Sequence, residues 1–284
     1  MNAIGIDVGG TKIAAALVDE QGRILDKRKF PVDRENTVAQ IAAVARELGG
    51  QRADRIGIVI PGIYYAETGD AWAPNLWGKD RVPLRTEVAR ELPWPVTIDS
   101  DRAAYVLGEQ WLGAAKGLND VVFVGVGTGI GAGIISGGRL IRGAGDIAGA
   151  VGWFALNPRW VPIYEQMGCF EAEAAGSSLG RRAGTTTEAV VEAARRGDAD
   201  ALRIIDDTVA YLAMGLANIV SLLNPEMIVL GGGLMQAGDL FLDPVRRAVP
   251  QWAQPMAARQ VRIELTELGE DAGVLGAARL ALLE

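Results

Sequence analysis

The first twelve residues contain side chains that together suit phosphate chemistry. An apolar run leads into Asp7, Gly9, Gly10, Thr11 and Lys12, and a second apolar run follows directly. Two glycines at a strand-to-strand turn permit positive φ and leave backbone N–H groups uncovered, so an anion can approach closely. The hydroxyl and the ammonium group add attraction, whereas the carboxylate suits a metal ion that accompanies the phosphates. An ordinary two-glycine hairpin is the alternative, but it requires none of these polar side chains. The stretch predicts a site for a phosphorylated ligand.

A second glycine-rich turn, formed by Gly127, Thr128 and Gly129, follows the apolar segment Asp120–Gly125. The six residues from Gly127 onward fit the G-x-G-x-x-A pattern of dinucleotide sites, but that pattern requires a helix to follow. Three more glycines occur by position 138 instead. The segment is therefore interpreted as a second phosphate-binding hairpin, and two such hairpins could hold the triphosphate of ATP.

Strands and helices alternate around these turns. Hydrophobic patterning predicts strands at Ala3–Val8, Lys12–Asp19, Arg23–Val32, Arg55–Ile60, Val96–Asp99, Asp120–Gly125, Ile130–Ile135 and Met227–Leu230. It predicts helices at Thr37–Leu48, Asp101–Ala115, Thr186–Arg196, Asp198–Leu223 and Asp271–Leu283, with one more helix opening after Gly231–Gly233. Ser100 is placed to cap the helix at Asp101. Because each half repeats strand, glycine turn, strand, turn and strand, we expect a duplicated α/β architecture.

Composition narrows the function. The 284 residues carry a net charge of −7 without a basic run, which argues against binding to nucleic acid. With no histidine and one cysteine, Cys169, the chain has neither Ser-His-Asp chemistry nor a disulfide framework. We expect that no apolar run reaches the length needed to cross a bilayer, and therefore a cytoplasmic protein without membrane contact. Acid–base work is left to Asp, Glu, Lys, Tyr or water.

The order and spacing of eight short segments resemble the ROK family of sugar kinases and regulators, within the actin-like ATPase superfamily. The matching segments are Asp7–Lys12, Pro61-Gly62, Pro74–Leu76, Asp101, Gly127–Gly131, Gly168–Glu171, Gly231–Gly233 and Leu275–Ala278. The resemblance implies a two-lobed, duplicated ribonuclease H-like fold with an interdomain cleft. We expect a small N-terminal lobe of residues 1–115 and 271–284 and a large C-terminal lobe of residues 116–270. The family tends toward homodimers.

The resemblance also implies an ATP-dependent kinase acting on a hexose or hexose derivative, with Asp101 as the general base for the attacking hydroxyl. A carboxylate in the first turn of a helix agrees with that role, because the helix dipole favours its ionised form. The implied sugar-binding residues are Gly62, Asn75, Ser100, Asp101, Trp153 and Glu171. The implied ATP-binding residues are Asp7, Gly9, Gly10, Thr11, Lys12, Gly127, Thr128 and Gly129, with Gly231, Gly232 and Gly233 at the adenosine. Mg²⁺ would accompany ATP, held by Asp7 through water.

The family pattern is broken at the sugar pocket. The family run E-x-G-H corresponds to Ala150–Trp153, so its glutamate is Ala150 and its histidine is Trp153. The asparagine that usually precedes the catalytic aspartate is Ser100. Of the family's zinc ligands only Cys169 is present, and one thiolate cannot hold a structural zinc, so no zinc is expected. We expect a substrate that differs from plain glucose near C1 or C2, such as a glycoside, an acylated amino sugar or a differently configured hexose.

Three alternatives stay open at this point. A catalytically idle sugar or nucleotide sensor of the same family is the main one, although the first strand at Ala3 leaves no space for the DNA-binding module of the family's repressors. A chaperone-type actin-like ATPase is disfavoured, because nothing resembles a client-binding domain. The same hairpins could also use polyphosphate or ADP as the phosphate donor.

Overall fold

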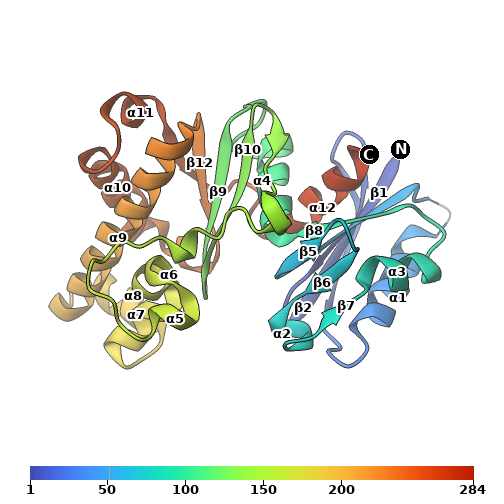
Figure 1. Ribbon diagram of the computed structural model, residues 1–284, viewed down its shortest axis with the longest axis horizontal. Coiled ribbons are helices and arrows are strands. Elements are labelled where there is room, and N and C mark those ends of the chain that lie inside the picture. Colours follow the sequence, from blue (N-terminus) through green and yellow to red (C-terminus); the bar gives the residue numbers. More distant parts are fainter. Residues whose placement is uncertain (51) are drawn as a thin grey trace. The chain divides into compact units, whose positions relative to one another are not determined.

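The computed structural model describes residues 1–50 and 52–284, which form two compact units (Figure 1). The first unit comprises Met1–Gly117, Leu140–Ala148 and Glu267–Glu284. The second comprises Leu118–Arg139 and Gly149–Thr266. The lobe boundaries given above stay a prediction.

A five-stranded sheet with the order β3-β2-β1-β4-β8 forms the centre of the first unit. Its strands are β1 (Asn2–Val8), β2 (Lys12–Asp19), β3 (Ile24–Pro31), β4 (Arg55–Ile60) and β8 (Val96–Ser100). The first three strands are antiparallel neighbours, whereas β4 and β8 run parallel to β1. The helices of this unit are α1 (Thr37–Gly49), α2 (Pro74–Trp77), α3 (Leu84–Glu91), α4 (Asp101–Leu112) and α12 (Ala272–Leu282), with 3₁₀ turns η1 (Ala144–Asp146) and η5 (Gly269–Asp271).

Side chains of β1 alternate between two cores, as the period of two in a strand requires. Ile4, Ile6 and Val8 pack in the cluster that includes residues of α1 and α3, and Ala3 packs in the cluster that includes α12. On the α12 face, Gly5 pairs in register with Gly57 of β4. A Cβ on Gly5 would lie 2.0 Å from a carbonyl oxygen of α12, and one on Gly57 would lie 1.8 Å from another. Glycine at both positions therefore lets α12 lie directly on the sheet.

Residues 62–95, for which the sequence predicted no regular structure, contain a small sheet. Strands β5 (Ile63–Tyr65), β6 (Asp70–Trp72) and β7 (Arg81–Val82) form an antiparallel sheet in that order. Helix α3 follows and packs Leu84 and Val88 into the first unit's core. These strands are two or three residues long, which is too short for alternation to be recognised in a sequence.

The second unit repeats the sheet of the first with the order β11-β10-β9-β12-β13. Its strands are β9 (Val121–Val126), β10 (Ile130–Ser136), β11 (Arg139–Leu140), β12 (Met227–Gly231) and β13 (Arg262–Leu265). Strand β10 is antiparallel to β9, and β12 and β13 continue in parallel. The corresponding strands have the same order in both units, and the pairs β10-β9, β9-β12 and β12-β13 have the directions of their counterparts, so the predicted duplicated α/β fold is confirmed.

The helices of the second unit lie on one side of its sheet (Figure 1). They are α5 (Tyr164–Met167), α6 (Cys169–Ala174), α7 (Gly176–Ala183), α8 (Thr187–Arg195), α9 (Ala199–Leu223), α10 (Gly238–Ala248) and α11 (Pro255–Gln260), with 3₁₀ turns η2 (Val151–Trp153), η3 (Gly233–Ala237) and η4 (Val249–Gln251). The helix predicted to begin after Gly231–Gly233 does not begin there. The short turn η3 follows these glycines, and the regular helix α10 begins at Gly238.

Within the described part of the chain, α9 is the one helix long and apolar enough to cross a membrane, so the expectation that no apolar run reaches this length was wrong. The most apolar window of this helix is 56% buried inside the structure. Leu212, Leu216 and Val220 belong to the core cluster of the second unit. A core helix passes the same length and composition test.

One expected helix boundary needs correction. Helix α4 ends at Leu112, not at Ala115, because Gly113 leaves helical geometry and the buried carboxylate of Glu109 accepts the N–H of Ala114 at 2.9 Å. The φ angles of Gly9 and Gly10 lie outside the left-handed region, so the first turn does not exploit the positive φ that glycine permits.

Candidate active site

Two carboxyl groups lie at the edge of the first sheet where its parallel strands end. Asp7 precedes the last residue of β1, and Asp101 directly follows β8 as the first residue of α4. Parallel pairing aligns Asp7 with Val59 of β4, and Val59 with Asp99 of β8. In open α/β sheets, the carboxyl ends of parallel strands are the usual place for ligands. The register of the parallel strands therefore places both predicted acidic residues at this edge.

Burial disturbs the ionisation of both residues, and the charge of Asp101 adds to the effect on Asp7. Desolvation, together with the like charge of Asp101 and despite the cation of Lys12, raises the pKa of Asp7 to about 7. Desolvation also raises the pKa of Asp101 to about 6, although Arg102 and backbone N–H donors favour its charged form. One of these donors is the N–H of Arg102, 2.8 Å from Oδ1 of Asp101. Two carboxylates that are both costly to ionise are a favourable setting for a bound cation.

A divalent cation fits the donor set around Asp7. A Cβ on Gly273 would lie 2.1 Å from Oδ2 of Asp7, so the glycine in α12 leaves the space that this carboxylate fills. Carboxylate oxygens are the ligands that Mg²⁺ prefers, and this ion commonly takes only one or two of them, with water and substrate phosphates completing its shell. Residues 1–50 and 52–284 contain no group of three or more His, Cys, Asp or Glu side chains that could hold a metal by themselves. The surroundings therefore suit a metal that arrives with phosphates.

The predicted phosphate-binding turn closes between β1 and β2, where the N–H of Gly9 donates to the carbonyl of Lys12 at 2.8 Å. Thr11 is exposed, and the ammonium of Lys12 lies 3.3 Å from Glu270. Glu270 also pairs with Lys29. The charge of Lys12 is thus partly matched by an acidic neighbour, which sequence reasoning missed because the two residues lie at opposite ends of the chain.

Three predicted sugar-binding residues also belong to the first unit. The position of a Cβ on Gly10 would lie 3.7 Å from Cβ of Asn75, so the first turn and α2 are neighbours. Gly62 lies against β6, where a Cβ would meet the carbonyl of Trp72 at 2.1 Å. Ser100 caps α4, as predicted, by accepting the N–H of Ala103 at 3.4 Å. Its hydroxyl hydrogen keeps the capacity to donate to a ligand.

Glu171 supports the glycine hairpin of the second unit. Its Oε2 accepts the N–H of Ile130 at 2.7 Å, and a Cβ on Gly129 would lie only 2.6 Å from the same oxygen. Desolvation raises the pKa of Glu171 above its ordinary value, opposed by this hydrogen bond. The structure therefore brings Glu171 and Gly129, predicted for the sugar and for ATP respectively, into contact within one unit.

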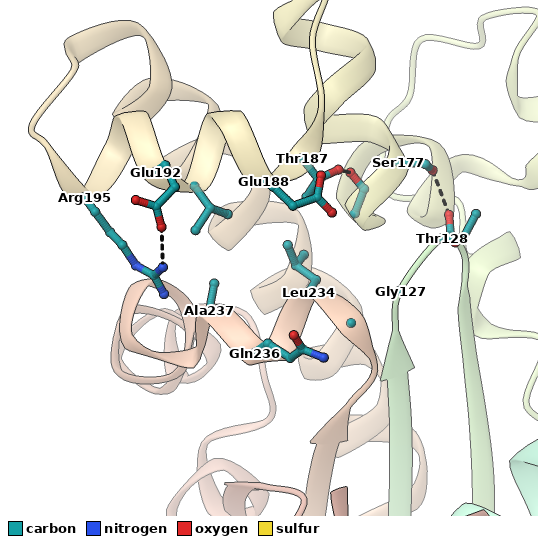
Figure 2. A pocket seen from close by; sticks show the side chains of 13 residues that line it. Gly127, Thr128, Ser177, Thr187, Glu188, Glu192, Arg195, Leu234, Gln236 and Ala237 are labelled. Atoms are coloured by element: carbon teal, nitrogen blue, oxygen red, sulfur yellow. Dashed lines mark hydrogen bonds and ion pairs between the residues drawn. The ribbon is translucent and has the colours of Figure 1, made fainter. Parts of the chain in front are cut away.

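A pocket of about 600 Å³ lies beside this hairpin in the second unit (Figure 2). It is lined by Gly127, Thr128, Gly176, Ser177, Thr187, Glu188, Val191, Glu192, Arg195, Gly233, Leu234, Gln236 and Ala237. The carbonyl of Gly127 accepts from the N–H of Gly176 at 2.7 Å, and the carbonyl of Thr128 accepts from the hydroxyl of Ser177 at 2.7 Å. These bonds tie the hairpin to the start of α7.

The walls of the pocket combine acidic and apolar groups. Figure 2 shows Glu188 of α8 and Gln236 of η3 on facing sides. Arg195 donates to Asp239 at 2.9 and 3.0 Å and to Glu192 at 2.9 Å, so its charge is already matched. The sequence did not predict that α8 lines this pocket, because the pattern of an amphipathic helix does not show which other elements the helix packs against. The signal that could have found α7 is the Gly176-Ser177 pair at its start.

The glycines Gly231, Gly232 and Gly233 have different structural roles. Gly231 ends β12 under the ring of Phe123, which a Cβ would meet at 2.4 Å. Gly232 has φ of +89°, and its Cβ would lie 2.5 Å from the carbonyl oxygen of Val126. Gly233 has open space around its Cβ position and lines the pocket. Of the three, Gly233 is thus the one whose backbone the pocket exposes.

Trp153 lies in the turn η2, and its side chain is 59% exposed. Cys169 is buried, and its sulfur accepts the N–H of Leu156 at 3.4 Å. Asp7, Lys12, Asn75 and Asp101 belong to the first unit, whereas Trp153 belongs to the second.

The sequence model of the ROK family matches residues 3–284. Glucokinase from Thermotoga maritima is 33% identical, over 99% of this chain and 97% of that protein. N-acetylmannosamine kinase from Escherichia fergusonii is 32% identical, over 99% of this chain and 98% of that protein. A solved ROK family glucokinase from Streptomyces griseus, in complex with glucose and AMPPNP, has a TM-score of 0.83 and 31% identity over 100% of both chains.

These matches cover nearly the whole of each chain and confirm the family and the actin-like ATPase fold predicted from short segments. They also confirm the predicted class of enzyme, an ATP-dependent carbohydrate kinase. The chain belongs to the ROK family.

Proposed function

We propose that the protein transfers the γ-phosphate of ATP to a hydroxyl of a hexose or hexose derivative, with Asp101 as the general base. The observation that carries this proposal is the pair Asp7 and Asp101 at the carboxyl edge of the first sheet. With its pKa raised to about 6, Asp101 is mostly ionised at neutral pH yet close enough to neutrality to accept a proton.

The proposed transfer forms one bond to the γ-phosphorus and breaks another. The sugar oxygen forms a bond to the γ-phosphorus, and the bond from that phosphorus to the bridging oxygen breaks. The bond's electron pair leaves with ADP, and the hydroxyl proton moves to a carboxylate oxygen of Asp101. Such a base contributes about 10²–10⁴-fold to the rate, and positioning and charge neutralisation supply most of the rest.

Asp7 is the residue that would hold Mg²⁺, directly or through water. The bound metal would neutralise charge on the phosphates. The turn from Gly9 to Lys12 would offer its backbone N–H groups, the hydroxyl of Thr11 and the ammonium of Lys12 to the same phosphates. Lys12 would then exchange its exposed partner Glu270 for a phosphate oxygen, at small cost because exposed ion pairs are weak.

The pocket beside Gly127 and Thr128 supports a nucleotide as the donor. Glu188 and Gln236 could accept from ribose hydroxyls or contact the base, and Leu234 offers an apolar wall. Among the described residues lining the pocket, Arg195 is the one cation, and it is paired with Asp239 and Glu192. A polyphosphate chain would place several negative charges near these carboxylates, so we expect ATP to be strongly preferred over polyphosphate.

The acceptor pocket is proposed to favour a substrate altered near C1 or C2. Glu171 and Asn75 would bind sugar hydroxyls, and Ala150 and Trp153 would replace a carboxylate and an imidazole of the family pattern. A site that loses such hydrogen-bonding groups no longer selects the hydroxyl they recognised. The relatives named above include kinases for glucose and for N-acetylmannosamine, which differ at C2.

A coupled ADP-release assay over hexoses, amino sugars and glycosides tests this function, with ATP and then polyphosphate as donor. We expect ATP-dependent turnover and the highest kcat/KM with a sugar modified at C1 or C2. A clear best rate with unmodified glucose would contradict the acceptor proposal. Sugar and ATP binding without turnover of any acceptor would instead support an idle sensor.

A further inference from the structure

A second pocket, of about 370 Å³, lies in the second unit next to Trp153. Its lining includes Trp153, Asn157, Trp160, Tyr164 and Glu165. The side chains of Trp153 and Trp160 are 59% and 62% exposed. Two largely exposed indoles at one small cavity present apolar faces to a ligand, whereas the indole N–H groups and the carboxylate of Glu165 provide polar contacts.

The inner wall of this pocket is fixed by an internal hydrogen-bond network. The hydroxyl of Tyr164 donates to Glu173, and the amide nitrogen of Asn157 lies 3.2 Å from the same tyrosine oxygen. Oδ1 of Asn157 accepts the N–H of Arg159 at 2.9 Å, which holds the chain that leads to Trp160. A wall built in advance of the ligand reduces the entropy lost on binding.

The backbone of Gly152 lies between the wall of this pocket and Glu171, the residue proposed to bind the sugar. Gly168 lines it, and a Cβ there would lie 2.7 Å from the Cα of Trp153 and 2.5 Å from the carbonyl oxygen of Gly152. Gly152 also lies against Glu171. A Cβ on Gly152 would lie 3.1 Å from both Cβ and Oε2 of Glu171. One residue of backbone thus separates Trp153 from Glu171.

We propose that this pocket binds a second pyranose ring attached to C1 of the phosphorylated sugar, so that the substrate is a disaccharide or a similar glycoside. This inference rests on the proposed function, because Glu171 must hold the acceptor ring. A pyranose has an apolar C–H face that packs on an indole, and hydroxyls at its edge that suit the exposed carboxylate of Glu165. Pockets that bury whole small molecules begin at about 300 Å³, so an acetyl group would leave most of this cavity empty.

Calorimetric binding to the full chain with Mg²⁺ and AMPPNP tests the pocket directly. The probes are glucose, its methyl glycosides, and α- and β-linked disaccharides of glucose, mannose and N-acetylglucosamine. We expect at least one disaccharide to bind at least about tenfold more tightly than its monosaccharide. Trp160→Ala should weaken that disaccharide by about tenfold and change monosaccharide binding less than about twofold.

Trp252→Ala is the matched control, because Trp252 is 60% exposed and is not among the residues lining this pocket. It should change neither affinity. Trp160→Leu keeps an apolar side chain and provides a second variant, with an intermediate loss expected, if the alanine variant fails to fold.

Equal or weaker disaccharide binding, or an unchanged preference in the Trp160 variants, would overturn the proposal. A change of oligomeric state by light scattering in Trp160→Ala, with sugar preference unchanged, would overturn it in favour of an interface between copies. The ADP-release assay separates this failure from that of the proposed function. Phosphorylation of monosaccharides with no disaccharide preference refutes the pocket alone, and tight disaccharide binding without any turnover refutes the kinase alone.

Discussion

Replacing Asp7 by asparagine should stabilise the ligand-free protein at pH 8 and flatten its pH dependence. The pKa of Asp7 is raised from 3.8 to about 7, a difference of roughly three units at about 1.4 kcal/mol each. A carboxyl whose pKa is raised on folding contributes its stability fully below the unfolded pKa and loses it as pH rises through the folded pKa. The wild type should therefore lose up to about 4 kcal/mol between pH 4 and pH 8 at this one residue. Asparagine carries no charge in that range and avoids the loss.

Urea unfolding at half-unit pH intervals, without nucleotide or divalent metal, gives the free energy of unfolding for both proteins. Other carboxyls titrate in the same range, so the informative quantity is the difference between wild type and variant at each pH. Asp80→Asn is the control, because Asp80 is an exposed residue of the same unit. Its difference from wild type should stay flat. Adding Mg²⁺ and ATP should stabilise the wild type more than Asp7→Asn, since the charged carboxylate then has a partner.

A stability difference between wild type and Asp7→Asn that is independent of pH between 4 and 8 would contradict a raised pKa of Asp7. A variant that becomes less stable than wild type as pH rises would contradict it too, because the charged form of Asp7 would then be favoured in the free protein. Either outcome would remove the electrostatic argument for a cation at this edge.

Three further predictions concern stability and nucleotide binding. The buried carboxylate of Glu109 accepts the N–H groups of Ala114 and Leu268, so Glu109→Ala should lower the free energy of unfolding by about 3 kcal/mol and Glu109→Gln by less, as measured in urea. Phe241 of α10 is fully buried in the second core, and Phe241→Ala should cost about 3–5 kcal/mol in the same assay, whereas truncating the exposed Met256 should cost little. Gly232→Ala forces a side chain at φ of +89° into the carbonyl of Val126, so calorimetry should show weaker ATP binding than in Gly269→Ala, which has positive φ but open space.

Much of the fold could be predicted because its strands carry strong local signals. Strands β2 and β4 match the expected bounds, since continuous apolar runs between turns leave little choice. The duplication was visible because both hairpins combine glycines with flanking strands. The small sheet β5-β6-β7 was missed, because its short strands pair with one another but show no hydrophobic pattern in the sequence.

The residues of the candidate site could be predicted only where neighbouring residues in the sequence mark their function. Asp7 and Asp101 follow strand ends, which is a local signal, and sheet register then brings those ends together. The contact between Lys12 and Glu270, the support of the Gly129 turn by Glu171, and the walls formed by Glu188 and Gln236 depend on long-range packing. No spacing rule in one sequence reports such contacts. The first turn closes without using the positive φ that glycine permits at Gly9.

The most direct test of the account is the turnover of Asp101→Asn, measured by ADP release with the best acceptor found in the sugar panel. Asparagine keeps the shape of the side chain but cannot accept the proton, so we expect kcat to fall by about 10²–10⁴-fold, with ATP affinity by calorimetry nearly unchanged. A kcat within about threefold of wild type would contradict the role of Asp101 as the general base.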